Sequence, residues 1–115
     1  MSAADIAADQ LKCVRALSVI LADGALTLPK SWTIHTFPGY EPSLTPMLEG
    51  FFHEFKAPTL AELHAVLDVY GERYGLKVEE KPHGEGGRIA VHATGVWQGV
   101  EVHVWGPAVS EAGVR

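Results

Sequence analysis

Cysteine is nearly missing from this sequence of 115 residues, in which Cys13 is the single example. An internal disulfide is therefore excluded, and such low cysteine use is typical of proteins of the reducing cytoplasm. No apolar run approaches the roughly 20 residues that cross a bilayer. No basic segment followed by an apolar one opens the chain, so we expect no signal peptide. These absences predict a cytoplasmic protein without a membrane partner.

Basic residues are also scarce, with nine Lys and Arg against fourteen Asp and Glu, which gives a net charge of −5. They are scattered singly and form no stripe, so we expect no nucleic-acid partner. The hydrophobic content of 47% and the charged content of 20% are typical of a folded globular protein. The length predicts one domain, which we place at residues 1–107, followed by a loose tail at residues 108–115.

Two alternating runs between residues 88 and 105 predict a β-hairpin that turns at Gln98 and Gly99, because glycine accepts a positive φ there. In this register one face is apolar: it carries Ile89, Val91, Ala93, Gly95, Trp97, Val100, Val102 and Val104. The opposite, outer face is mixed: it carries Ala90, His92, Thr94, Val96, Glu101, His103 and Trp105. A slip by one residue would bury Glu101 and His103, so the pattern favours this register strongly.

Two amphipathic helices are predicted. The first spans about residues 3–22, and Gly24 is expected to end it in the left-handed conformation. Its expected buried stripe is Ile6, Cys13, Val14, Leu17, Ile20 and Leu21. The second begins after Thr59, which forms a capping box with Glu62, and ends at Gly75. Its expected buried stripe is Leu60, Leu63, Val66, Leu67, Tyr70 and Tyr74.

Three further strands are predicted at residues 32–37, 47–55 and 76–81. The middle one could also be a short helix, but Gly50 and two adjacent aromatic residues favour an extended backbone. The resulting order is helix, strand, strand, helix, strand, strand, strand. It predicts an α+β fold: a two-layer sandwich with both helices on the apolar face of a mainly antiparallel five-stranded sheet.

Three short blocks carry a resemblance to a known group of proteins. The segments VRAL at residues 14–17, LHAVLD at 63–68 and TGVWQGVEV at 94–102 resemble small uncharacterised α+β proteins of actinobacteria, their phages and their integrative elements. The resemblance covers most of the expected order of elements. It implies an accessory protein of a mobile element, and it carries over no activity or site residue.

The histidines offer one possible metal site. His92 and His103 are diagonal neighbours on the outer face, and His35 joins them there if the first strand buries Trp32 and Ile34. Zn²⁺ takes about four ligands, and Glu101 or His53 could complete the set. The spacing matches no metal signature, however. We therefore expect ordinary polar surface residues, no metal and no cofactor, and we keep a metal-binding or hydrolytic domain as the alternative.

Other patterns of catalytic residues are weak. Cys13 lies in the middle of a helix on its apolar stripe, which favours a structural role over a nucleophile. The glycine-rich segment at residues 83–87 leads into a strand, not a helix, and Glu85 would repel phosphate. We therefore expect no catalytic residues.

Trp105 is the hardest residue to explain as plain surface, because the hairpin register directs it outward beside His92. A large aromatic side chain on an outer sheet face is either covered by the chain itself or used in contact with another chain. We therefore expect a non-catalytic binding module whose outer face mediates self-association, as a homodimer, or capture of another protein. A structural component of a phage particle is a further alternative.

Overall fold

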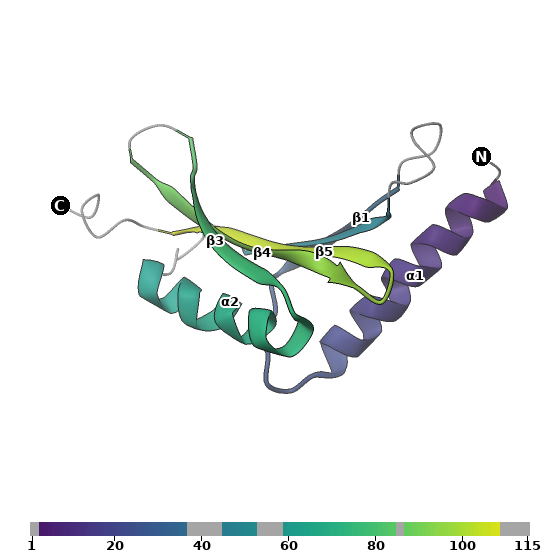
Figure 1. Cartoon of the computed structure of the whole chain (residues 1–115), viewed down its shortest axis with the longest axis horizontal. Coiled ribbons are helices and arrows are strands. Elements are labelled where there is room, and N and C mark those ends of the chain that lie inside the picture. The colour runs from purple at the N-terminus through teal and green to yellow at the C-terminus, as the bar shows by residue number, and fades with distance from the viewer. Residues whose placement is uncertain (1–2, 37–44, 53–58, 85–86, 109–115) are drawn as a thin grey trace.

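The protein is an α+β fold with two helices and a five-stranded mixed sheet (Figure 1). The computed structural model describes residues 3–36, 45–52, 59–84 and 87–108. Its elements are α1 (Ala3–Ala22), β1 (Ser31–His35), β2 (Met47–Phe51), α2 (Leu60–Tyr74), β3 (Lys77–Pro82), β4 (Ile89–Trp97) and β5 (Val100–Ala108). This is the order of elements that the sequence predicts. No helix in these described stretches combines the length and the apolar character of a membrane-crossing segment.

The strands follow the order β1-β2-β5-β4-β3 across the sheet. The pairs β1–β2, β5–β4 and β4–β3 are antiparallel, which confirms the prediction of a mainly antiparallel sheet. The pair β2–β5 is parallel and was not predicted. It joins two strands that are separated along the chain by α2, β3 and β4. Such a long-range pairing leaves no local signal in the sequence.

The β4–β5 hairpin has the predicted turn and register, with Trp97 opposite Val100 and His92 opposite Trp105. Both turn residues have positive φ, 53° at Gln98 and 75° at Gly99. Two such residues in succession are typical of a type I′ turn, whose twist matches that of the flanking strands. The turn therefore fixes which side chains of the two strands lie on each face.

The hydrophobic core contains residues of both helices and of the sheet. α1 contacts β1, β2 and β5, whereas α2 contacts β3, β4 and β5. In Figure 1, α2 lies beneath β3, β4 and β5, and α1 lies on the side of the sheet where β1 is. The buried cluster is Cys13, Ala16, Ile20, Leu48, Leu63, Leu67, Tyr70, Tyr74, Leu76, Val91, Ala93, Val100, Val102, Val104 and Ala108. The faces of the hairpin are therefore as predicted.

The second helix has the predicted ends. Thr59 Oγ1 accepts the backbone N–H of Glu62 at 3.2 Å, and the Glu62 side chain accepts the Thr59 N–H, which completes the capping box. Gly75 ends the helix in the left-handed conformation, with φ at 67°. These signals lie within a few residues of each other, so the sequence specifies them locally.

The first helix spans the predicted residues but differs from the prediction in its buried face. Val14 and Leu21 are exposed to 45% and 49%, and Ala16 is buried instead. The helix contacts the sheet through Cys13, Ala16 and Ile20, which lie on the other side of the helix axis. The predicted buried stripe was therefore wrong for Val14 and Leu21, because the apolar residues of α1 occupy two separate faces.

The end of the first helix also differs from the prediction. Gly24 is not among the glycines with positive φ, so it does not end the helix in the left-handed conformation. The Asp23 carboxylate accepts the backbone N–H of Ala25 at 3.1 Å, which turns the chain by a side-chain hydrogen bond instead. A short polar side chain can replace a left-handed glycine in this role.

The bounds of several strands differ slightly from the predicted ones. β1 ends at His35, and β2 confirms an extended segment from Met47 to Phe51. β5 continues to Ala108, which is buried and pairs with Ile89. Other predicted features lie outside the described residues: the end of the first predicted strand at Phe37, His53, Glu85 and residues 109–115.

Candidate functional site

The outer face is the side of the sheet that points away from the buried cluster. One row of side chains on it, Lys81, Ala90 and Pro107, includes two buried residues, Ala90 and Pro107. Three rows with more exposed side chains follow. The first row is Glu79, His92, Trp105 and Phe51; the second is Lys77, Thr94, His103, Glu49 and Thr33; the third is Val96, Glu101, Met47 and His35. The six residues predicted for a binding surface, His92, Thr94, Val96, Glu101, His103 and Trp105, all lie in these rows. The strand register thus places them on one surface.

Trp105 lies in the first of these rows, on the central strand β5, and is half-buried by its own neighbours. Its ring is parallel to that of His92, with an interplanar angle of 3° and centroids 5.0 Å apart. On its other side the Phe51 ring lies 4.6 Å away. The indole N–H donates to Glu49 Oε2 at 2.8 Å. Trp105 is therefore held in one orientation and does not project freely.

Glu49 links two parts of the outer face. Its second oxygen, Oε1, lies 2.9 Å from His35 Nε2, within hydrogen-bond distance. Burial by itself would raise the pKa of the Glu49 carboxyl, but the hydrogen bonds from His35 and Trp105 outweigh it and hold that pKa below its usual value. At neutral pH the Glu49 carboxylate is consequently ionised, and its position next to Trp105 is set by the two hydrogen bonds.

His92 and His103 form a hydrogen-bonded pair, with His92 Nδ1 and His103 Nε2 2.7 Å apart. Burial, together with the nearby charges of His103 and Lys81, lowers the pKa of His92 to about 4. Burial also lowers the pKa of His103, against the opposing effect of Glu49. Both rings are therefore uncharged at neutral pH, and one ring N–H donates to the lone pair of the other.

The alternative of a metal site finds no support in this geometry. Within the described part of the chain, no three His, Cys, Asp or Glu side chains are grouped so that they could hold a metal ion. His35 faces Glu49, whereas His92 and His103 face each other. Glu101 lies one row away from His103. The three candidate ligands share a face but do not converge on a point.

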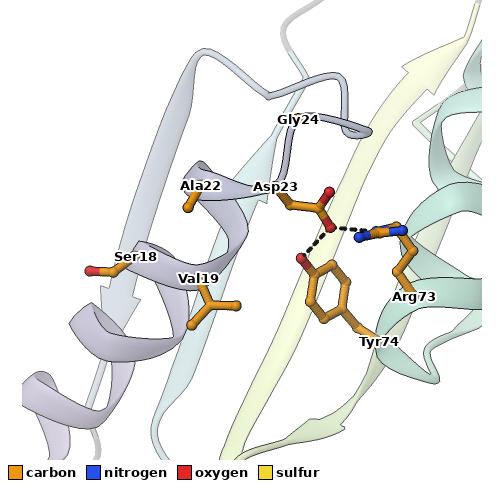
Figure 2. A pocket seen from close by; sticks show the side chains of 7 residues that line it. All are labelled: Ser18, Val19, Ala22, Asp23, Gly24, Arg73 and Tyr74. Carbon is orange, nitrogen blue, oxygen red and sulfur yellow. Dashed lines mark hydrogen bonds and ion pairs between the residues drawn. The ribbon is translucent and has the colours of Figure 1, made fainter.

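A second feature lies on the other side of the molecule, between the ends of α1 and α2. It is an open hollow of about 590 Å³ lined by Ser18, Val19, Ala22, Asp23, Gly24, Arg73 and Tyr74 (Figure 2). Figure 2 shows Asp23 directed at Arg73 and Tyr74, and the Tyr74 hydroxyl donates to Asp23 Oδ2 at 2.8 Å. Arg73 forms an ion pair with the same oxygen.

The polar groups of this hollow are used within the chain. The Asp23 side chain is 9% exposed. The hydrogen bond from Arg73 is the chief cause that lowers the pKa of its carboxyl, helped by those from Ala25 and Tyr74. Asp23, Arg73 and Tyr74 therefore link the end of α1 to the end of α2, and we call these three residues the latch. The sequence gives no indication of it, because Asp23 and Arg73 are 50 residues apart.

No protein-family model, curated protein or solved structure matches this chain. Its function has to be inferred from the site itself. The outer face is the stronger candidate, because its aromatic rings and imidazoles are gathered on one surface and their orientations are fixed. The hollow between the helices, by comparison, has its charged groups paired with each other.

Sequence reasoning found six residues of the outer face but missed Glu49 and Phe51. A signal for them existed, because alternation along the second strand places Met47, Glu49 and Phe51 on one side. What the alternation does not give is the neighbour of that strand. The parallel pairing of β2 with β5 brings Glu49 to Trp105, and this pairing could not be predicted.

Proposed function

We propose that this chain is a non-catalytic binding module and that its outer face holds a partner polypeptide. The observation that carries the proposal is the fixed orientation of Trp105, which Glu49 holds at 2.8 Å and His92 stacks against. An aromatic side chain that is already ordered loses little conformational entropy on binding, which favours its use as a contact residue. Tryptophan is also among the residues that contribute most to protein interfaces.

The proposal includes the two-layer arrangement expected from the sequence, with both helices on one face and the other face open to a partner. Its support is that Cys13 and Ile20 of α1 and Leu67 of α2 share one core with the apolar side of the hairpin. In Figure 1, the β3–β4 hairpin bends away from α2, toward the side of the outer face. The outer face, with the β3–β4 hairpin along one side of it, can therefore accommodate a polypeptide segment that lies across the strands.

The chemistry of the outer face indicates what kind of partner it takes. Its carboxylates are Glu49, Glu79 and Glu101, and Lys77 lies 3.2 Å from Glu79 in an ion pair. The His92–His103 pair carries no charge at neutral pH. Val96, at one end, is 65% exposed. Apolar and aromatic groups bordered by polar ones are typical of non-obligate protein interfaces. We therefore propose a partner segment with apolar and polar side chains.

The absence of catalysis is part of the proposal and rests on two groups. Cys13 is fully buried, and burial, together with the charge of Asp9, raises the pKa of its thiol, so the reactive thiolate is disfavoured. The nitrogens of His92 and His103 that face each other are occupied by their mutual hydrogen bond. The resemblance noted in the sequence suggests that such a module serves a mobile element. Its partner would then be a second copy of the chain or a protein of a phage particle, and the test below distinguishes the two.

The test replaces Thr94, in the central row of the outer face, with arginine. Thr94→Arg adds a bulky charge beside His103 and should abolish partner binding while leaving the core intact. The matched control is Thr27→Arg, at an exposed connector position whose backbone oxygen accepts a hydrogen bond from Tyr70 and keeps it in the variant. Both variants should show the wild-type circular dichroism spectrum.

Binding is measured in two ways, by sedimentation of the purified chain and by co-purification from the producing cells. The proposal expects an association that Thr94→Arg removes and Thr27→Arg preserves. A chain that sediments as a monomer and co-purifies with no protein in a Thr94-dependent manner would contradict it.

A further inference from the structure

The helix α1 exposes a second apolar face that the core does not use. Leu11, Val14 and Leu21 are exposed to 47%, 45% and 49%. The residues that bury α1 against the sheet, Cys13 and Ile20 among them, lie on the opposite side of the helix. Large apolar side chains on the solvent side of a helix require an explanation when they recur at regular spacing.

The spacing of this face is regular over the whole helix. The positions are Ala4, Ala7, Leu11, Val14, Ser18 and Leu21, and we call these six residues the α1 seam. They are separated by three and four residues in alternation, which is the a and d pattern of a heptad repeat. With about 100° per residue, they lie within an arc of roughly 100° on the helix surface. No member of the seam is charged.

Ser18 is the one polar member, and its hydroxyl is already satisfied. Ser18 Oγ donates to the backbone oxygen of Val14 at 2.9 Å, within the helix. A hydroxyl bonded in this way can enter an apolar contact without losing a hydrogen bond to water. The seam is therefore suited to burial along its entire length.

We propose that the α1 seam pairs in antiparallel orientation with the α1 seam of a second copy of this chain. In this arrangement a positions pack against d positions, so Leu11 meets Val14 of the second copy. By the same register Ala7 meets Ser18, and Ala4 meets Leu21. Each layer occurs twice about a two-fold axis, as a closed dimer requires.

Self-complementarity is the reason for choosing a second copy in this orientation. The antiparallel register places the small Ala4 against the large Leu21, so only the Ala7–Ser18 layer pairs two small residues. A parallel pair would place Leu21 against Leu21 and Ala4 against Ala4, and would leave the N-terminal half thin. The seam offers no charge to an acidic or a basic partner. Arg15, which flanks it, faces the neutral Ala8 of the second copy in this register.

The proposal goes beyond the function of the outer face and is independent of it. The seam lies on the side of α1 that is turned away from the sheet, so pairing leaves both outer faces free. A single helix face about 30 Å long offers less area than a stable dimer interface, which buries roughly 800 Å² per partner. The dimer is accordingly a weak one, formed at high protein concentration.

The test compares two valines on the same helix. Val14 belongs to the seam and Val19 does not, yet both are 45% exposed. Sedimentation equilibrium at up to about 1 mM chain should show a dimer for the wild type. Val14→Glu should weaken association at least about tenfold. Val19→Glu should associate as the wild type does, and both variants should keep the wild-type circular dichroism spectrum.

The orientation is tested by a charge pair placed in the central layer. Leu11→Glu and Val14→Lys should each be monomeric alone, and mixing the two variants should restore a heterodimer. Restoration by a mixture of Leu11→Glu with Leu11→Lys instead would show a parallel pair and overturn the proposed orientation.

Two results would overturn the proposal altogether. One is a wild-type chain that remains monomeric at about 1 mM. The other is an equal effect of Val14→Glu and Val19→Glu. If Thr94→Arg abolishes the dimer and Val14→Glu does not, the contact lies on the outer face, so the seam fails while the proposed function gains support.

Discussion

Acidification should destabilise this protein chiefly through His92 and His103. The pKa of His92 is lowered from 6.5 to about 4 in the folded chain, and that of His103 is lowered as well. Between pH 6.5 and about pH 4, His92 binds more protons in the unfolded chain than in the folded one. The free energy of unfolding therefore falls as the pH falls. The loss begins near pH 6.5 and is complete below pH 4 for His92.

The expected size of the effect follows from the same values. A lowering from 6.5 to about 4 corresponds to at most roughly 3 kcal/mol for His92. Because the ring is only half-buried, water reduces this figure, and we expect about 1–2 kcal/mol. Lys81 and His83 oppose protonation of His92, whereas Glu79 favours it. Below about pH 4.5 Glu49 adds a second loss, because its folded pKa is also lowered and its contribution disappears on protonation.

The assay is urea unfolding followed by tryptophan fluorescence at several pH values between about 7.5 and 4.5. His92→Gln should flatten the dependence of the unfolding midpoint on pH. His64→Gln is the matched control, since His64 lies near Glu80 on the α2 side, with Nε2 and Oε2 2.6 Å apart, and is no part of the pair. A wild-type midpoint that does not change over this range, or an unchanged slope in His92→Gln, would refute the reasoning.

Three further predictions concern the turn, the latch and the imidazoles. Gly99→Val places a β-branched residue at φ of 75° and should destabilise the fold by more than ~1 kcal/mol; an unchanged melting temperature would contradict the assigned turn. Tyr74→Phe removes the hydrogen bond to Asp23 and should lower the melting temperature by roughly 5 °C, whereas no change would show that the latch contributes nothing. Protein purified without an affinity tag should contain less than about 0.2 equivalents of zinc by elemental analysis; near-stoichiometric metal that is lost on replacing His92 and His103 by alanine would restore the metal-site alternative.

The hairpin and the second helix could be predicted from the sequence because their signals are local. The alternation on either side of Gln98 and Gly99 fixes the register, and the turn residues lie between the two strands. The capping pair Thr59 and Glu62 is likewise separated by one helical turn. Since each pattern lies within one short segment, no knowledge of the remaining fold was needed.

The remaining features depend on contacts between distant segments. Alternation places Glu49 on a face of β2, but the neighbour of β2 is decided by the whole sheet. Periodicity likewise could not tell which apolar side of α1 is buried. Val14 and Cys13 are both apolar, adjacent in the sequence and compatible with a helical stripe, yet the structure buries Cys13 and exposes Val14. Only packing against β1, β2 and β5 distinguishes the two sides.

The central claim, that the outer face contacts another polypeptide, is tested most directly by site-specific photocrosslinking in the producing cells. A photoreactive amino acid replaces Thr94 on the outer face or, as the control, the exposed Ala65 on α2. We predict a crosslinked band, to a second copy or to another protein, from position 94 and none from position 65. No crosslink from position 94, or equal crosslinking from both positions, would contradict the claim.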